Sequence, residues 1–157
     1  MDAAIARDIA RDSHEGQLTR HGSPMTEHVE RVAATVADDE RAVAFLHDVL
    51  EKTGTHLDDL HRRGLTPVER AALDVLTRRD GETFERHALR IGDADGAAGA
   101  IARRVKLADL EDHIGLASDA SDAPPYRWAR RHVLASQHRH RETAGPSPAV
   151  TPQPPAA

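Results

Sequence analysis

The sequence predicts an all-α protein that folds as one compact domain. Apolar residues recur at three- and four-residue spacings along most of the chain, and no stretch alternates clearly between apolar and polar residues as a strand would. Aromatic residues make up only 3% of the chain, so the core has to be built from Ala, Leu and Val, which favours helices that approach one another closely. A chain of 157 residues is long enough to bury one substantial core. We therefore expect a bundle of about seven or eight helices.

Each expected helix is bounded by residues that favour turns or helix ends, chiefly Gly, Pro, Asp and Thr. Thr66-Pro67, for example, supplies a cap and a first-turn proline, and Thr26 can cap the helix that carries His28. The expected helices are, in chain order, Ala3 to near His14, Thr26 to the break at Asp38-Asp39, the run through His47-Asp48 that Thr53-Gly54-Thr55 ends, His56–Arg63 before Gly64, Val68–Arg79, Glu82–Ile91 after Asp80-Gly81, Ala97–Leu116, and Pro124 to near Arg141.

Composition divides the chain into a helical domain and a tail, and it argues against several classes of protein. Residues 1–142 form the expected helical domain, and residues 143–157 are a Pro- and Ala-rich tail without apolar periodicity, which we expect to be disordered. A formal net charge of -5 argues against general nucleic-acid binding, and the absence of cysteine excludes disulfides and thiolate sites. Neither an export signal nor a segment of membrane-spanning length is evident, so we expect a cytoplasmic protein; the oligomeric state stays open.

An adjacent His47-Asp48 pair lies inside the apolar run of residues 43–51. Burying such a pair among Val, Phe and Leu is costly unless something compensates it. A divalent metal ion does so, because neutral imidazole and carboxylate are its ordinary ligands. Neighbouring helix residues point about 100° apart, so both side chains can reach one ion from a single turn. Taken alone, the pair is equally consistent with a core histidine bonded to a surface aspartate.

Two further segments offer metal ligands. His28 opens a helix after a loop rich in Gly, Ser and Pro, and Asp109 is an acid set into the apolar face of residues 104–110. Three separated helices thus each carry one or two metal-ligand residues, which is the arrangement in which a helical core converges on an ion. Glu51, four residues after His47 and on the same helical face, can hold a water bound to that ion.

The order His, then His-Asp, then Asp resembles the HD superfamily of metal-dependent phosphohydrolases. Within it, the chain is similar to the RelA/SpoT-type hydrolase and small alarmone hydrolase branch. Five segments, spread over roughly residues 4 to 118, carry the resemblance in the family's order. They are His14-Glu15-Gly16-Gln17, Gly22-Ser23-Pro24 leading to His28, Phe45 to Thr53, Leu73 to Thr77, and Val105 to Asp109.

The resemblance implies one divalent ion and its ligands. Mn²⁺ is the first expectation, with Fe²⁺, Co²⁺ and Zn²⁺ as alternatives, because His and carboxylate ligands accept all four. The implied ligands are His28, His47, Asp48 and Asp109.

The resemblance and the spacing also suggest catalytic and substrate-binding residues. Glu51 would orient or deprotonate the attacking water, and Lys106 would supply positive charge over the open side of the ion. His113, one turn after Asp109, would donate a proton to the leaving oxygen or contact the sugar. The candidate substrate contacts are Arg20, Lys52 and Arg78.

The chain departs from the alarmone hydrolases around the nucleotide rather than around the metal. Lys52 stands where the family usually has aspartate, Thr19-Arg20 replaces an Arg-Lys pair that holds guanine, Met25 replaces a tyrosine, and His113 replaces an asparagine near the ribose. We therefore expect a phosphohydrolase that cleaves a phosphate ester of a nucleotide or a similar small molecule. The alternatives are a guanosine tetra/pentaphosphate 3′-pyrophosphohydrolase and a non-enzymatic nucleotide-binding module that the metal pins together.

Overall fold

The regular structure of the chain consists of helices within residues 1–117 and 123–143, which the computed structural model describes. These residues form no β-sheet, and one isolated bridge, between Leu18 and Pro24, closes the loop after the first helix. The all-α prediction is therefore confirmed. The elements are α1 (Ala3–Ser13), α2 (Met25–Ala34), the 3₁₀ turn η1 (Asp38–Glu40), α3 (Arg41–Leu46), α4 (Val49–Lys52), α5 (Leu57–Arg62), α6 (Pro67–Leu76), α7 (Phe84–Asp93), α8 (Gly96–Leu116) and α9 (Pro124–Thr143).

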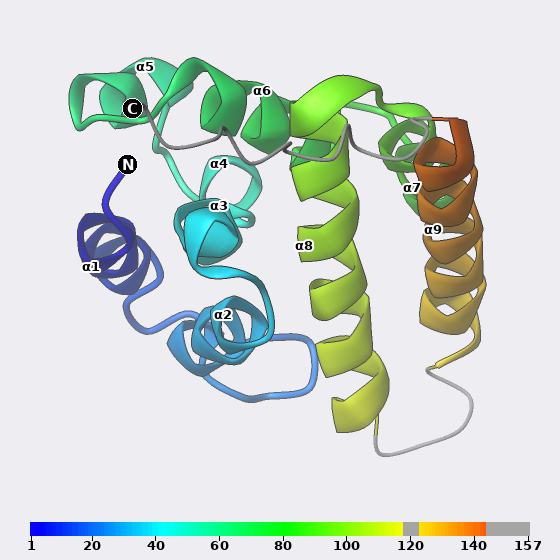
Figure 1. Cartoon of the computed structure of the whole chain (residues 1–157). Helices are drawn as coiled ribbons and strands as arrows, with labels where there is room; N and C mark the ends of the chain where they lie inside the picture. Colours follow the sequence, from blue (N-terminus) through cyan, green and yellow to red (C-terminus); the bar gives the residue numbers. More distant parts are fainter. Residues whose placement is uncertain (118–122, 144–157) are drawn as a thin grey trace, which may run out of the picture.

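The long helix α8 is the central element of the fold. It runs between α2 and α3 on one side and α9 on the other, while α5 and α6 lie across one end of the molecule (Figure 1). Helix α8 contacts α2, α3, α6, α7 and α9. A side chain on the face of α8 that meets α2 and α3 therefore lies close to residues from the first third of the chain.

Small and branched apolar residues fill the core, as the composition predicts. Helices α1, α3, α6 and α8 each place at least one fully buried alanine in it, which allows their backbones to approach closely. Leu46, Leu73 and Val105 fill the space between these helices and are completely buried. A second, smaller cluster around Leu110 and Tyr126 attaches α9 to α7 and α8.

One expected helix is interrupted at the His47-Asp48 pair. The sequence predicts a continuous helix through this pair, but both residues lie in a turn between α3 and α4. The ring Nδ1–H of His47 donates to the carbonyl oxygen of Ala44 at 2.7 Å. Local side-chain bonds of this kind compete with the helical backbone ladder. The pair therefore leaves the regular helix while keeping backbone angles close to helical values.

The other differences from the expected boundaries are small. Helix α2 is preceded by Pro24 rather than capped by Thr26, and α9 continues to Thr143. The expected tail was residues 143–157; its first residue, Thr143, ends α9, and the rest lies outside the described residues. Helix α6 ends at Leu76, three residues earlier than predicted. Arg90 explains this end, because its guanidinium donates to the carbonyl oxygens of residues 75 and 77 at 3.0 Å each.

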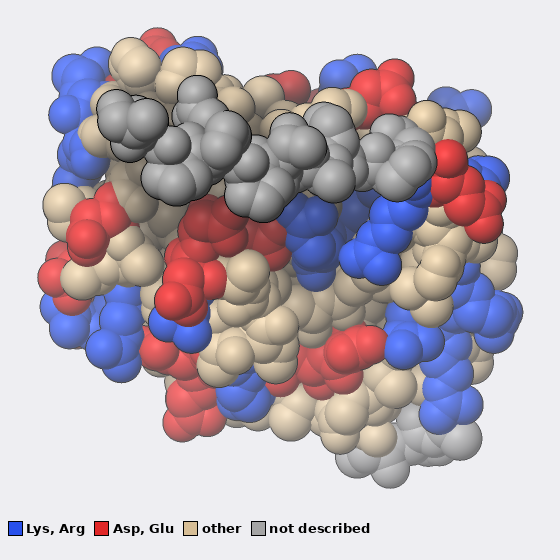
Figure 2. Space-filling view, in the orientation of Figure 1, with Lys and Arg blue, Asp and Glu red and all other residues tan. Residues whose placement is uncertain are grey.

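Charge is unevenly distributed over the surface. The chain carries a formal net charge of -5, yet Lys and Arg side chains gather over α9 on the right of the face shown in Figure 2. The exposed arginines of this helix are Arg127, Arg131, Arg139 and Arg141. No helix in the described part of the chain combines the length and the apolar character that crossing a membrane requires.

Candidate metal centre

The four predicted metal ligands converge at one point in the structure. His28 comes from α2, His47 and Asp48 from the turn between α3 and α4, and Asp109 from α8. The Nε2 atoms of His28 and His47 lie 3.3 Å apart. The Nε2 atom of His28 lies 3.8 Å from Oδ2 of Asp48 and 3.3 Å from Oδ1 of Asp109. The corresponding distances from His47 Nε2 are 3.5 Å and 3.8 Å.

These distances are those expected between ligands that share one ion. Two donors that each lie about 2.1 Å from an ion are roughly 3.0 Å apart at a right angle and roughly 3.4 Å apart at the tetrahedral angle. The five separations that involve one or both histidines span 3.3 to 3.8 Å, close to these values. The residues present therefore fit a mononuclear centre for a divalent ion.

Both histidines are fixed in the tautomer that a metal requires. His28 Nδ1 lies 2.7 Å from Oδ2 of Asp112, and His47 Nδ1 lies 2.7 Å from the carbonyl oxygen of Ala44. Both partners are acceptors, so the Nδ1 atoms carry the protons and the Nε2 lone pairs point toward the centre. In the neutral imidazoles the two Nε2 lone pairs face each other across 3.3 Å, an arrangement that a bound cation would stabilise.

The electrostatics of the centre also favour a cation. Burial opposes a charge on His47, but the carboxylates of Asp48 and Asp109 outweigh it and raise the pKa of His47. Burial likewise opposes ionisation of Asp48 and Asp109, yet neighbouring positive groups, mainly His47 and Lys52 for Asp48 and Lys106 for Asp109, lower the pKa of both carboxyl groups. The centre thus holds two ionised carboxylates beside two imidazoles in a buried site.

Asp112 is part of this site and was not predicted from the sequence. Its carboxylate accepts from His28 Nδ1 and also from Arg31, whose Nε and Nη2 atoms lie 2.6 Å and 3.1 Å from its two oxygens. A weak signal existed, because Arg31 follows His28 by three residues and Asp112 follows Asp109 by three. Each pair therefore occupies neighbouring positions on one helical face.

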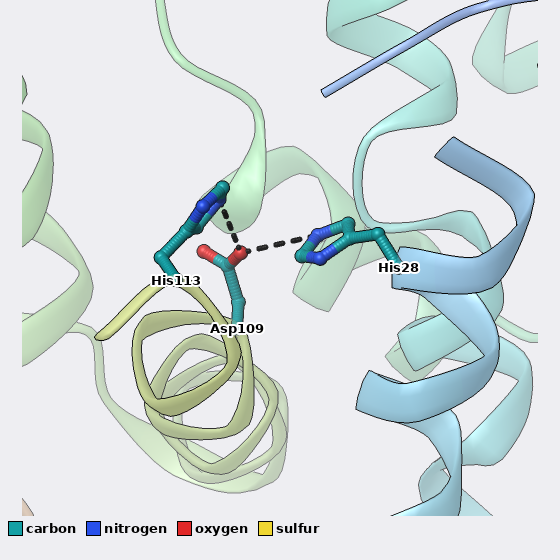
Figure 3. A group of neighbouring side chains, drawn as sticks. All are labelled: His28, Asp109 and His113. Atoms are coloured by element: carbon teal, nitrogen blue, oxygen red, sulfur yellow. Dashed lines mark ion pairs between the residues drawn. The ribbon is translucent and has the colours of Figure 1, made fainter. Parts of the chain in front are cut away.

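His113 approaches the same centre from a second side. Its Nε2 atom lies 3.3 Å from Oδ1 of Asp109, the oxygen that also faces His28 (Figure 3). His28, Asp109 and His113 form one group able to hold a metal ion, and His28, His47 and Asp48 form another. Both groups contain His28, so they describe two sides of a single centre.

A cavity of about 310 Å³ opens beside the centre. Every predicted catalytic and substrate-binding residue lines it, together with three of the four predicted ligands; the fourth, His28, is fully buried behind them. The lining residues are Gln17, Leu18, Thr19, Arg20, Met25, His47, Asp48, Glu51, Lys52, Leu76, Arg78, Phe84, His87, Lys106, Asp109, His113 and Tyr126.

Three ion pairs join acidic and basic side chains that line the cavity. Glu51 and Arg78 form an ion pair at 3.1 Å, and Glu51 also accepts from the backbone N–H of Arg78 at 3.1 Å. Lys52 Nζ donates to Asp48 at 2.5 Å, and Lys106 Nζ donates to Asp109 at 2.7 Å. Each of these three carboxylates therefore has a basic partner.

An aromatic group that lines the cavity beside His113 was not predicted. The ring of Tyr126 stacks on His113 with centroids 4.8 Å apart, and Phe84 meets Tyr126 edge-on at 5.7 Å. Arg20 donates to the Tyr126 hydroxyl at 3.0 Å, which connects the loop after α1 to α9. Leu18 lies at the cavity and remains 65% exposed. The lining of the cavity thus combines the candidate metal ligands, basic side chains and an apolar, aromatic group.

Comparison with known proteins adds no relative to this description. No family model matches the chain, and a search of curated proteins found no match.

Proposed function

We propose that the protein is a metal-dependent phosphohydrolase that cleaves a phosphate ester of a nucleotide or a similar small molecule. The observation that carries the proposal is the convergence of two Nε2 lone pairs and two carboxylates beside a cavity that Arg20, Lys52, Arg78 and Lys106 line. A divalent ion explains the convergence, and the basic side chains explain an attraction for phosphate.

The residues of the cavity suit hydrolysis by water. When bound, the ion supplies a Lewis acid for a phosphoryl oxygen and a water that ionises near neutral pH. Glu51 orients or deprotonates that water, and its ion pair with Arg78 fixes the carboxylate. Lys106 contributes positive charge where the transition state accumulates negative charge. His113, supported by its stack on Tyr126, donates a proton to the leaving oxygen.

The dimensions of the cavity favour a small substrate. Ligand cavities commonly measure roughly 300 to 1,000 Å³, and this one, at about 310 Å³, lies at the lower end. A compact phosphate ester fits within such a volume. Tyr126 and Phe84 offer a flat apolar surface to the organic part of that ester.

A screen for phosphate release tests the proposal. The parent protein is incubated with nucleotides, alarmones and sugar phosphates, in Mn²⁺ and in chelator, beside Asp48→Ala and a matched control, Asp39→Ala, at an exposed acid in η1. We expect release by the parent and by Asp39→Ala that needs Mn²⁺, and neither metal retention nor release by Asp48→Ala. Release by Asp48→Ala as fast as that by the parent contradicts the site. Metal retention without turnover of any substrate favours the non-enzymatic module.

A further inference from the structure

Two lysines bind the two carboxylates of the centre through different oxygens. Lys106 donates to Oδ2 of Asp109, whereas Oδ1 of the same carboxylate faces His28 and His47. Lys52 donates to Oδ2 of Asp48, and this is the oxygen that faces the two histidines, at 3.8 Å and 3.5 Å. Lys106 therefore bonds the outer oxygen of its partner, and Lys52 bonds the inner one.

This difference gives the two lysines opposite effects on an incoming ion. By holding the outer oxygen, Lys106 turns Oδ1 of Asp109 toward the centre and leaves it available as a ligand. Lys52, by contrast, occupies one of the directions from which an ion would approach Oδ2 of Asp48, the oxygen that would bind it. An ion about 2.1 Å from that oxygen would lie roughly 4 Å from the Lys52 ammonium, and like charges at this separation repel strongly in a buried site.

Lys52 is also the lysine whose ammonium group can move away from its carboxylate partner. Its side chain is 38% exposed at the end of the short helix α4, whereas that of Lys106 is 14% exposed and lies over the ring of Phe84. A lysine carries its charge on a flexible four-carbon stem. Because Lys52 also lines the cavity, its ammonium can exchange Asp48 for an anionic oxygen bound there.

We propose that Lys52 competes with the metal ion for Asp48 and that a phosphate group in the cavity relieves this competition. The inference rests on the proposed function, because it takes the centre to bind a divalent ion and the cavity to bind a phosphate. It makes the two binding events cooperative: phosphate draws Lys52 away from Asp48 and tightens metal binding, and bound metal tightens phosphate binding by the same factor. The residue that departs from the family pattern thus links metal loading to the presence of substrate.

Calorimetric titration with Mn²⁺ tests this inference without any measurement of turnover. The proteins are the parent, Lys52→Met, which keeps the length of the side chain without its charge, Lys52→Arg, which keeps the charge, and Lys106→Met as the matched control. Each is titrated with and without methylphosphonate, which has the charged oxygens of a phosphate ester but no ester bond to cleave. Circular dichroism confirms that each variant is folded.

We expect Lys52→Met to bind Mn²⁺ at least tenfold more tightly than the parent in the absence of methylphosphonate. Lys52→Arg should stay within about threefold of the parent, and Lys106→Met should bind no more tightly than the parent. Methylphosphonate should tighten Mn²⁺ binding to both the parent and Lys52→Met, because the ion contacts the probe in both proteins. The tightening factor should be at least five times larger for the parent, where the probe also draws Lys52 away from Asp48.

The outcomes separate this inference from the proposed function. If the parent binds Mn²⁺ and Lys52→Met binds it no more tightly, or if Lys106→Met gains as much affinity, competition by Lys52 is wrong and the metal centre stands. An equal effect of methylphosphonate on the parent and on Lys52→Met overturns the cooperative part. If neither the folded parent nor folded Lys52→Met binds Mn²⁺, the proposed function fails and the inference fails with it.

Discussion

Replacing Asp112 by asparagine tests whether the centre depends on a residue that does not face the ion. The Asp112 carboxylate accepts from His28 Nδ1 on one side and from Arg31 on the other, and only 10% of its side chain is exposed. Asparagine has nearly the same shape but only one acceptor oxygen. Whichever way its amide turns, an NH₂ group faces the donor of either His28 or Arg31. One strong donor therefore loses its partner in a mostly buried position.

The size of the effect follows from these contacts. Loss of the acceptor that orients a ligating histidine typically weakens metal binding by about 10- to 100-fold. The metal-free protein also loses a charge-assisted pair, and hydrogen bonds to charged groups contribute about 1.5–3 kcal/mol each to stability. We therefore expect Asp112→Asn to lower the free energy of unfolding by about 2 kcal/mol and to raise the Mn²⁺ dissociation constant at least tenfold.

Two measurements and one control decide the outcome. Urea unfolding of the metal-free protein reports stability, and calorimetric titration with Mn²⁺ reports affinity. The control is Glu111→Gln, at the adjacent position of α8, where an exposed carboxylate pairs with Arg130. Exposed pairs contribute about 0–1 kcal/mol, so this variant should match the parent in both assays. If Asp112→Asn binds Mn²⁺ within twofold of the parent, Asp112 does not orient His28 and our account of the tautomer is wrong.

Two further predictions concern stability. In α8, Gly99→Ala should destabilise the fold by about 2 kcal/mol or more, because an added Cβ would lie 2.1 Å from the carbonyl oxygen of Ala94. Gly115→Ala, whose added Cβ meets nothing within 4 Å, should stabilise the fold by up to about 1 kcal/mol. Equal melting temperatures for the two variants would contradict this prediction. The hydrogen bonds and charge of Arg90 lower the pKa of Glu82 to about 2. A carboxylate with a lowered pKa stabilises the fold above its usual pKa and loses that effect as the pH falls. Unfolding measured between pH 5 and pH 2 should therefore show a smaller loss of stability in Glu82→Gln than in the parent, and Glu82→Gln should be about 1 kcal/mol less stable at pH 7.

Much of the fold could be predicted because its boundaries are encoded locally. Thr66 caps α6 as expected, its hydroxyl accepting from the backbone N–H of Glu69 while the Glu69 carboxylate accepts in return from the N–H of Thr66. Gly64 adopts a φ of +96°, which explains why the short helix α5 stops before it. Such signals involve residues within a few positions of one another, so a single sequence is enough to find them.

The site was only partly predictable because several of its contacts join distant segments. The convergence of His28 with Asp109 was expected from their residue types and from the family resemblance. The contact between His28 and Asp112 spans 84 positions, and that between Arg20 and Tyr126 spans 106. No local pattern marks such pairs, since they depend on how α2, α8 and α9 pack.

Lys52 illustrates the same limit within one turn of helix. Its spacing of four residues from Asp48 allowed a contact, and its departure from the family pattern was visible in the sequence. Which carboxylate oxygen it would bond was not, because that depends on how the turn between α3 and α4 rotates the Asp48 side chain. The break in the helix was itself missed, since residues 43–51 contain no Gly or Pro that would signal a helix end.

The stacking of Tyr126 on His113 has a consequence for any shortened version of this chain. A fragment that stops after α8 would retain every proposed ligand of the ion, as well as Glu51 and both lysines. It would nevertheless lose the ring that supports His113 and the hydroxyl that anchors Arg20. The proposed ligands therefore all precede α9, whereas contacts to the organic portion of a substrate depend partly on α9, which also packs against α7 and α8.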